Sequence, residues 1–440
     1  MSSNISKIFE ELTMSRLRKF LYDTNYLSSK QHGFTPNKST MTAINSVMHH
    51  AFKHLSNNHF SIIIFIDFVR AFDCVNHDLL LTKLENAGVR DLSLKWFQSY
   101  LEKRSQFVEI DFFTSNMNEV IQSELCPINK GVFQGTKLAC LLFNVFLNDL
   151  LLNISCNELI DVAYADDYTI CVSGSCINHL FNVSNQILSR VNDWCLDNSF
   201  SINTNKTHYL LINPHPKASY LCSNSLFLND VPVSRIDEFN FLGLKIDEKL
   251  SWQPHIESLI PKLRRSCYLF RVTKNSISKQ HQLVLYNAYF ASHLHYGIQF
   301  WGYSHLIHRV LLIQKRCLRI IFNKERRASC RPIFKNFKIL TVVSIYILEV
   351  CCVVHSYAND KFMTNSSIHC HNTRKNGEIF RARDHRQVDQ TLKIYNKLPP
   401  SVRQLNMSKF RSLLKKFLVK NCFYSLKEFY DFKFSIKKSL

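Results

Sequence analysis

No apolar run in this 440-residue sequence approaches the roughly 20 residues that a membrane-spanning helix needs. Residues 1–11 also lack the apolar core of a secretory signal peptide. The 15 cysteines are an odd number and include no CxxC pair, which is not the pattern of a disulfide framework. We therefore expect no membrane association and an intracellular protein with reduced thiols, in the cytoplasm, the nucleus or both.

The sequence also lacks the ligand spacing of a zinc site. The His-Cys-His run at residues 369–371 follows Cys351, Cys352 and His355, but these side chains crowd into one region and have no paired spacing elsewhere. Zinc is the less favoured interpretation. The cysteines are better explained as small buried apolar residues.

Acidic residues are scarce in the second half of the chain. Residues 1–212 carry 17 Lys+Arg and 20 Asp+Glu, whereas residues 213–440 carry 38 and 14, so the net charge of +21 originates in the second half. Clustered Lys and Arg are typical of surfaces that bind nucleic-acid phosphates. Basic helices can equally be ordinary solvated surfaces, so charge alone leaves both interpretations open.

Two adjacent carboxylates, Asp166 and Asp167, lie between apolar, β-branched runs. This pattern predicts a β-hairpin that carries both acids at its tip. The apolar run at residues 60–66 predicts a buried strand that ends at a third acid, Asp67. An Asp-Asp pair in a turn is by itself usually only solvated. Three carboxylates at strand ends could, however, hold two Mg²⁺ ions about 4 Å apart and support nucleotidyl transfer.

The order of predicted elements is mixed α+β. Residues 1–57 have a polar, helical pattern, and between residues 58 and 212 apolar strands alternate with amphipathic helices. After three short strand candidates the pattern becomes almost wholly helical, with a polar loop at residues 359–390 and a basic helix at residues 408–420. A chain of this length should contain two or three domains.

The acids belong to two longer motifs. Asp67 opens the run Asp-Phe-Val-Arg-Ala-Phe-Asp, and Asp166 and Asp167 close the run Tyr-Ala-Asp-Asp. Together with the segments around them, these motifs resemble the reverse transcriptases of non-LTR (LINE-type) retrotransposons, most closely the jockey-like elements. The resemblance implies a right-hand polymerase fold in which the three acids are ligands of two Mg²⁺ ions, or of Mn²⁺. A group II intron maturase would share the acids, but such a protein usually continues into a DNA-binding or endonuclease region.

The resemblance divides the chain into four parts. Residues 1–57 correspond to partial fingers and residues 58–246 to a palm with an antiparallel sheet, a nucleotide pocket and a primer-grip hairpin. Residues 247–330 correspond to a helical thumb and residues 331–440 to a basic, helical C-terminal region. The residues similar to the primer grip are Phe241, Leu242 and Gly243.

Four further residues are implied in nucleotide binding. The ring of Phe72, five residues after the first acid, would lie under the incoming sugar and exclude a 2′-hydroxyl, although core packing is the alternative for such a ring. Gln134 and Gly135 match the nucleotide-pocket motif, at a helix N-terminus that favours phosphate. Lys206 matches the lysine expected to meet the triphosphate and protonate pyrophosphate, with an ordinary surface lysine as the alternative.

Some positions depart from the family pattern. The Gln-His-Gly-Phe run at residues 31–34 matches, but Thr35 and Asn37 replace a basic residue and a glycine, and Lys38 keeps one charge. Phe133 replaces a proline of the nucleotide-pocket motif, which predicts a looser loop. We recognise no earlier finger motif, endonuclease or RNase H acids, and therefore expect a truncated element.

The predicted function is an RNA-directed DNA polymerase that adds deoxynucleotides to a primer 3′-hydroxyl. Its expected partners are an RNA template, a DNA primer and dNTPs, and the basic helices after Lys262 are expected to clamp the template and primer. The alternative is a truncated or inactive polymerase that binds nucleic acid without extending it.

Overall fold

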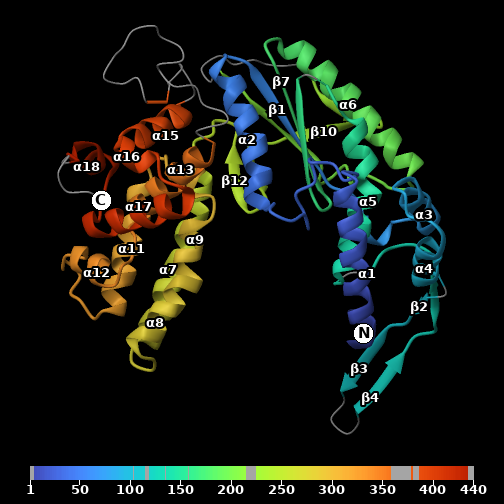
Figure 1. The fold of residues 1–440 in the computed structure, drawn as a ribbon, viewed down its shortest axis with the longest axis horizontal. Coiled ribbons are helices and arrows are strands. Elements are labelled where there is room, and N and C mark those ends of the chain that lie inside the picture. Colours follow the sequence, from blue (N-terminus) through green and yellow to red (C-terminus); the bar gives the residue numbers. More distant parts are fainter. Residues whose placement is uncertain are drawn as a thin grey trace. The chain divides into compact units, whose positions relative to one another are not determined.

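A computed structural model describes residues 4–102, 104–113, 118–133, 135–156, 158–214, 224–357, 378–379 and 386–434. The chain forms two compact units, shown in Figure 1. The first, here called the sheet unit, comprises Met1–His54 and Asn58–Ile236, and the second, the helical unit, comprises Leu55–Asn57 and Asp237–Leu440.

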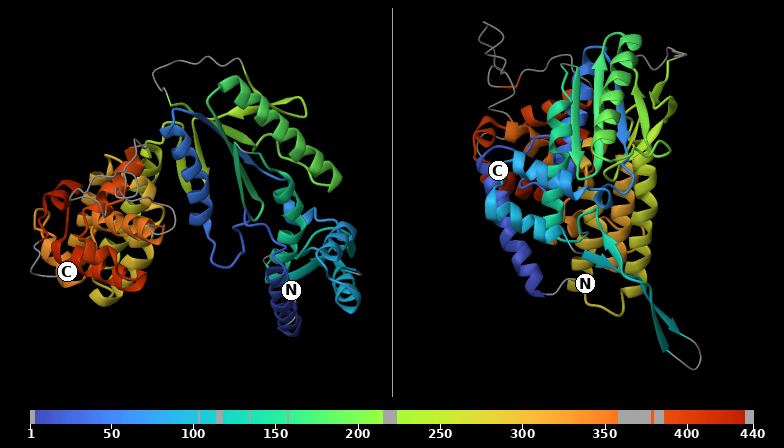
Figure 2. Two further views of the ribbon diagram at one scale, coloured as in Figure 1. Left: turned by 45° about the horizontal axis from the view of Figure 1, so that its top comes forward. Right: turned by 90° about the vertical axis from the view of Figure 1, so that its right-hand side faces the viewer.

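The sheet unit combines a central sheet with long helices (Figures 1 and 2). Its helices are α1 (Asn4–Asp23), α2 (Thr40–Ser56), the short 3-10 helix η1 (Ala71–Asp73), α3 (His77–Asn86), α4 (Asp91–Leu101), α5 (Lys137–Asn153) and α6 (Ile177–Asp197). Its strands are β1 (Phe60–Ile66), β2 (Arg104–Gln106), β3 (Glu109–Phe113), β4 (Asn118–Gln122), β5 (Cys126–Ile128), β6 (Leu159–Tyr164), β7 (Asp167–Gly174), β8 (His208–Ile212), β9 (Leu226–Leu228) and β10 (Val231–Arg235).

Six of these strands form one sheet in the order β6-β7-β1-β8-β10-β9. Its pairs are antiparallel except β8–β10, and β1 is buried along its whole length between β7 and β8. The expected strand at residues 60–66 and the expected hairpin are therefore confirmed. In the register, Ile66 pairs with Tyr168 and Tyr164 pairs with Asp167, so the end of β1 lies beside the tip of the β6–β7 hairpin.

Two helices of the sheet unit, α3 and α5, begin at a side chain that caps them. The Asn76 side chain caps α3 by accepting hydrogen bonds from the backbone N–H groups of Asp78 and Leu79. Thr136 caps α5 by accepting from the Ala139 N–H at 3.2 Å. Because α5 and α6 bury their apolar residues in the same hydrophobic core as β1 and β7, this core supports the end of the sheet that carries the acids.

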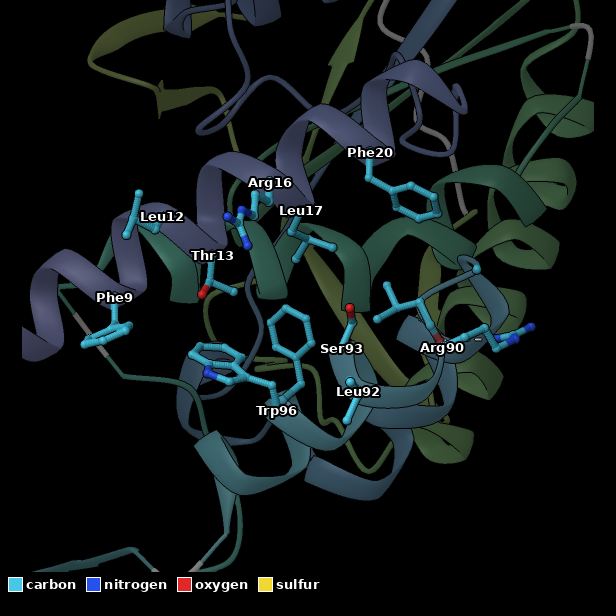
Figure 3. A pocket seen from close by; sticks show the side chains of 13 residues that line it. Phe9, Leu12, Thr13, Arg16, Leu17, Phe20, Arg90, Leu92, Ser93 and Trp96 are labelled. Atoms are coloured by element: carbon cyan, nitrogen blue, oxygen red, sulfur yellow. Dashed lines mark hydrogen bonds between the residues drawn. The ribbon is translucent and has the colours of Figure 1, made fainter.

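A groove of about 650 Å³ follows α1 on the side that faces α4 (Figure 3). Leu17 is buried beside it, but Phe9 and Leu12 are 59% and 55% exposed. From α4, Trp96 and Leu92 line the other wall. Helix α1 is thus anchored on one face and leaves an apolar edge open to solvent.

The helical unit begins with the hairpin of β11 (Glu238–Phe241) and β12 (Leu244–Asp247). Its helices are α7 (Gln253–Thr273), α8 (Lys279–Tyr286), the π-helix η2 (Asn287–Ala291), α9 (Ser292–His295), α10 (Ile298–Trp301), α11 (Ile307–Ile321), α12 (Arg331–Asn336), α13 (Val342–Tyr357), α15 (Arg386–Asn396), α16 (Pro400–Arg403), α17 (Met407–Asn421) and α18 (Leu426–Asp431). The basic helix expected at residues 408–420 is confirmed as α17.

One expectation about the second half changes. The predicted loop at residues 359–390 extends too far, because α15 begins at Arg386 and buries Leu392 and Tyr395 at helical spacing. The β11–β12 hairpin, which includes the candidate primer-grip residues, packs with the helical unit, where Asp247 accepts hydrogen bonds from the backbone N–H groups of Ser251 and Trp252. The four-part division itself stays a prediction.

Within the described ranges, the thirteen cysteines are all free thiols, and none of the helices combines the length and the apolar character that crossing a bilayer requires. The run at residues 369–371 lies outside the described residues. His355 uses both ring nitrogens, with Nδ1 3.0 Å from the Tyr395 hydroxyl and Nε2 2.8 Å from the Leu405 carbonyl.

Candidate active site

Three carboxylates lie at adjoining strand ends of the central sheet. Asp67 follows β1 directly, Asp166 lies in the two-residue turn between β6 and β7, and Asp167 begins β7. The backbone of Asp67 is fixed on both sides, because its carbonyl accepts from the Asn203 N–H at 2.8 Å and its own N–H points to the Thr207 hydroxyl at 3.4 Å. The register therefore brings the first acid to the tip of the hairpin that carries the other two.

The three acids share one electrostatic environment. Asp167 is exposed at the tip, yet the protein around it removes enough water to raise the pKa of its carboxyl, and the negative charges of Asp166 and then Asp67 raise it further. In the part of the chain that the structure describes, no three His, Cys, Asp or Glu side chains converge closely enough to hold a metal ion by themselves. The acids are hard oxygen donors of the kind that Mg²⁺ prefers together with substrate phosphates. A bound cation would also neutralise the repulsion between their negative charges.

Lys206 is the cation that the structure brings to the first acid. Its ammonium nitrogen lies 3.9 Å from Oδ2 of Asp67, and its side chain is 69% exposed. An ion pair so long and so exposed contributes little to stability. The ammonium group is consequently available to an anionic ligand at the acids.

Phe72 occupies the short helix η1 and is half-buried. Its ring stacks on that of Phe143 from α5, with ring centres 4.3 Å apart. This contact supports the alternative interpretation of Phe72 as a core-packing residue. The Phe72 carbonyl also accepts from the Val132 N–H at 2.9 Å, which ties it to the candidate nucleotide-pocket loop at residues 131–135. The packing fixes the ring beside that loop, and its role against ribose stays a prediction.

The nucleotide-pocket loop is held on its N-terminal side. Gly131 donates to the Val75 carbonyl at 2.7 Å, and the Phe133 ring lies against the Arg104 guanidinium at 3.8 Å. This cation–π contact and the edge of Tyr100 anchor the Phe133 ring, and the looser loop stays a prediction. Gln134 lies outside the described residues. Gly135 has φ +95°, a conformation that only glycine adopts easily.

Two residues of the candidate fingers that depart from the family pattern, or stand beside such a departure, have specific structural roles. Asn37 has φ +61°, and since asparagine tolerates this left-handed conformation better than most residues, it can replace glycine there. Lys38 donates to the carbonyls of Ser29 and Gln31, and burial lowers the pKa of its ammonium group. The ammonium group of Lys38, the charge that remains in the candidate fingers, therefore holds this loop closed through hydrogen bonds to its backbone.

The candidate primer-grip residues lie in the helical unit, so the structure assigns them no distance to the acids. Leu242 and Gly243 form the turn between β11 and β12 with φ +46° and +87°. The Tyr296 hydroxyl donates to the Leu242 carbonyl, and a side-chain carbon on Gly243 would lie only 3.3 Å from the Tyr296 ring. Phe241 is buried. The backbone conformation of the turn and the nearby Tyr296 ring are enough to require glycine at position 243, with no need for a contact to nucleic acid. The primer-grip role stays a prediction.

A second charged site lies wholly within the helical unit. Residues of α7, α11 and the turn after α11 surround a cavity of about 960 Å³. We call it the basic cavity, and its charged lining residues are Arg271, Lys274, Arg316, Arg319, Lys324, Glu325 and Arg326. The guanidinium of Arg319 is held in place by donating from Nε to the Ala328 carbonyl at 2.8 Å. Six cations and one acid around one cavity favour an anionic ligand.

Sequence reasoning missed one contributor to the acid site. The side chain of Gln31 hydrogen-bonds the backbone of Ala165, the residue just before Asp166. The fingers motif that contains Gln31 was recognisable, but 134 residues separate the two positions and no periodic pattern connects them.

The amino-acid sequence is similar to known reverse transcriptases. A family model described as "Reverse transcriptase (RNA-dependent DNA polymerase)" matches residues 1–246. From Drosophila melanogaster, the "Probable RNA-directed DNA polymerase from transposon BS" is 26% identical over 72% of this chain, and the "RNA-directed DNA polymerase from mobile element jockey" is 24% identical over 76%. The chain spans 35% and 36% of the lengths of these relatives. An apo telomerase from Candida tropicalis is 14% identical, with a TM-score of 0.36 over 53% of this chain and 44% of that one.

Proposed function

Since this chain belongs to the reverse transcriptase family, we propose that it is the polymerase portion of a non-LTR retrotransposon protein, adding deoxynucleotides to a primer 3′-hydroxyl on an RNA template. Membership brings with it the right-hand polymerase architecture, in which the six-stranded sheet would be the palm. The observation that carries the proposal is the set of three carboxylates at adjoining strand ends whose charges act on one another.

The three acids would hold two divalent cations, Mg²⁺ or Mn²⁺. When bound, such a pair lowers the pKa of the attacking hydroxyl and stabilises the leaving pyrophosphate. Asp67, Asp166 and Asp167 would together supply the carboxylate oxygens that hold the ions. Lys206, already beside Asp67, would meet the triphosphate and supply a proton to the leaving group.

The remaining residues of the sheet unit would hold and select the nucleotide. Gly135, with its left-handed backbone at the start of α5, would allow close approach of the phosphates, and Gln134 would contribute beside it. The Phe72 ring, immobilised against Phe143, would leave no space for a 2′-hydroxyl.

The basic cavity would bind the nucleic acid. Its six cations can neutralise several phosphates and release their counterions, which is the main source of affinity for RNA and DNA backbones. The partners of the protein would be an RNA template, a DNA primer and dNTPs. It would work where RNA meets a DNA primer, in the cytoplasm or the nucleus, where the free thiols stay reduced.

Primer extension on an RNA template tests this proposal. Asp166→Asn should reduce extension by about 10²- to 10³-fold, since it removes a charge that holds the metal ions on which transition-state stabilisation depends. The matched control, Asp197→Asn, lies on the exposed end of α6 and should keep the wild-type rate. Extension that is equal in Asp166→Asn and wild type, or absent from both, would overturn the proposal, and nucleic-acid binding without extension would support an inactive polymerase instead.

A further inference from the structure

The loop that contains Gln31 completes the edge of the sheet beside the acids. Strand β6 is the last strand of the sheet, and its Ala163 pairs in parallel with Gln31. The His32 N–H donates to the Ala163 carbonyl at 2.7 Å, and the Ala163 N–H donates to the Lys30 carbonyl at 3.0 Å. A segment of the fingers motif therefore acts as a short additional strand next to the hairpin tip.

The Gln31 side chain extends the hydrogen bonding of this segment beyond Ala163, because it bonds the backbone of Ala165 in the turn. It is only 3% exposed. Its Oε1 accepts from the N–H groups of Gly33 at 2.7 Å and Ala165 at 3.1 Å, and its Nε2 donates to the Ala165 carbonyl at 3.3 Å. Both polar groups of Ala165 are thus bonded by one side chain.

The turn needs this support because of its conformation. Ala165 has φ +58°, a left-handed conformation that alanine rarely adopts. The opposing backbone comes so close that a side-chain carbon on Gly33 would lie 2.2 Å from the Ala165 nitrogen. The Gly33 carbonyl is in turn held by the Asn144 amide of α5 at 3.0 Å. The loop is thereby fixed to the core helix on one side and to the acid-bearing turn on the other.

We infer that Gln31 is a positioning residue for catalysis: its three hydrogen bonds hold the turn at Ala165 in the one backbone conformation that aims the Asp166 and Asp167 carboxylates at the metal ions. The inference deepens the proposed polymerase function and rests on it for the kinetic result. The structural result, order of the hairpin tip, does not depend on activity.

The test compares Gln31→Leu with Gln98→Leu, the same substitution at an exposed glutamine of α4. In Gln31→Leu we expect kcat of primer extension to fall about 10²-fold, because an error of about 1 Å in the placement of catalytic groups costs that much. The Mg²⁺ concentration for half-maximal rate should rise, while the Kd for an RNA–DNA duplex should stay within about twofold. Amide hydrogen exchange at Ala165 should become at least tenfold faster. Gln98→Leu should match wild type in all four measurements.

A kcat within about twofold of wild type would overturn the inference, as would unchanged exchange at Ala165. If Gln31→Leu does not fold, Gln31→Met, which keeps the length of the side chain, is measured in the same way. If the wild-type protein does not extend primers, the proposed function fails, and exchange at Ala165 together with Mn²⁺ affinity still decides the inference. Unchanged Mn²⁺ affinity in Gln31→Leu would then refute it.

Discussion

The acid site of the sheet unit and the basic cavity of the helical unit position charge in opposite ways. The acid site uses three short side chains on a backbone that strand register holds at Asp67 and Asp167 and that hydrogen bonds hold at Asp67 and at Ala165, next to Asp166. The basic cavity uses six long side chains from two helices and a turn, of which Arg319 is held by a hydrogen bond to backbone. Chemistry at a metal ion needs precise placement, whereas binding of a phosphate backbone needs density of charge. Substitutions should therefore affect the two sites differently.

The largest effect should come from the first acid. Asp67→Asn keeps the size of the side chain but removes a charge from the metal ligands, so primer extension should fall by about 10²- to 10³-fold. Affinity for an RNA–DNA duplex should not fall with it, because the basic cavity is untouched. Asp78→Asn, at an exposed position in the first turn of α3, serves as the control. Parallel losses of rate and affinity in Asp67→Asn would break the distinction between the two sites.

The opposite substitution removes cations from the cavity. Lys274→Gln combined with Arg316→Gln should weaken duplex binding about uniformly across sequences and reduce the slope of log K against log salt by about 2, since each lost phosphate contact reduces it by about 1. At saturating nucleic acid, kcat should be unchanged. Filter binding between low and moderate salt measures the slope. Lys415→Gln with Lys416→Gln on α17 removes the same charge elsewhere, and an equal change of slope there would assign binding to net charge rather than to the cavity.

Phe72 tests whether a packed ring can also select substrate. Phe72→Val should raise the relative use of ribonucleotides by about tenfold or more, because removing a steric block gives a discrimination of this order. The loss of stacking on Phe143 should also lower the thermal stability of the sheet unit. Single-nucleotide incorporation of dNTPs and rNTPs measures the first effect. If stability falls and discrimination stays, the ring is a core residue only.

The contrast between the two sites also explains what the sequence could predict. The strand ending at Asp67 and the hairpin at Asp166 follow from local alternation of apolar and polar residues, and both are confirmed. The anchoring of Phe133 by Arg104 and of Ala165 by Gln31 depends on contacts between distant segments, for which the chain has no periodic signal. In the same way, the helical periodicity predicted basic helices, but not which of their cations converge on one cavity.

The smallest effect concerns the cost of holding the acids together without a cation. In the folded protein, burial and the charges of Asp166 and Asp67 raise the pKa of Asp167 above its usual value of 3.8. A raised pKa means that the folded state binds this proton more tightly than the unfolded state does, so stability from this group is present at low pH and is lost as pH rises through the folded pKa. Asp167→Asn should therefore raise Tm at pH 7 by on the order of a degree, and the gain should vanish as pH falls toward 3.8.

Mg²⁺ should raise the Tm of the wild type more than that of the variant, because it compensates the same repulsion. Differential scanning fluorimetry with Asp111→Asn, an exposed acid of β3, as control measures both effects. A lower Tm for Asp167→Asn at pH 7 would mean that hydrogen bonding, not repulsion, dominates at the tip.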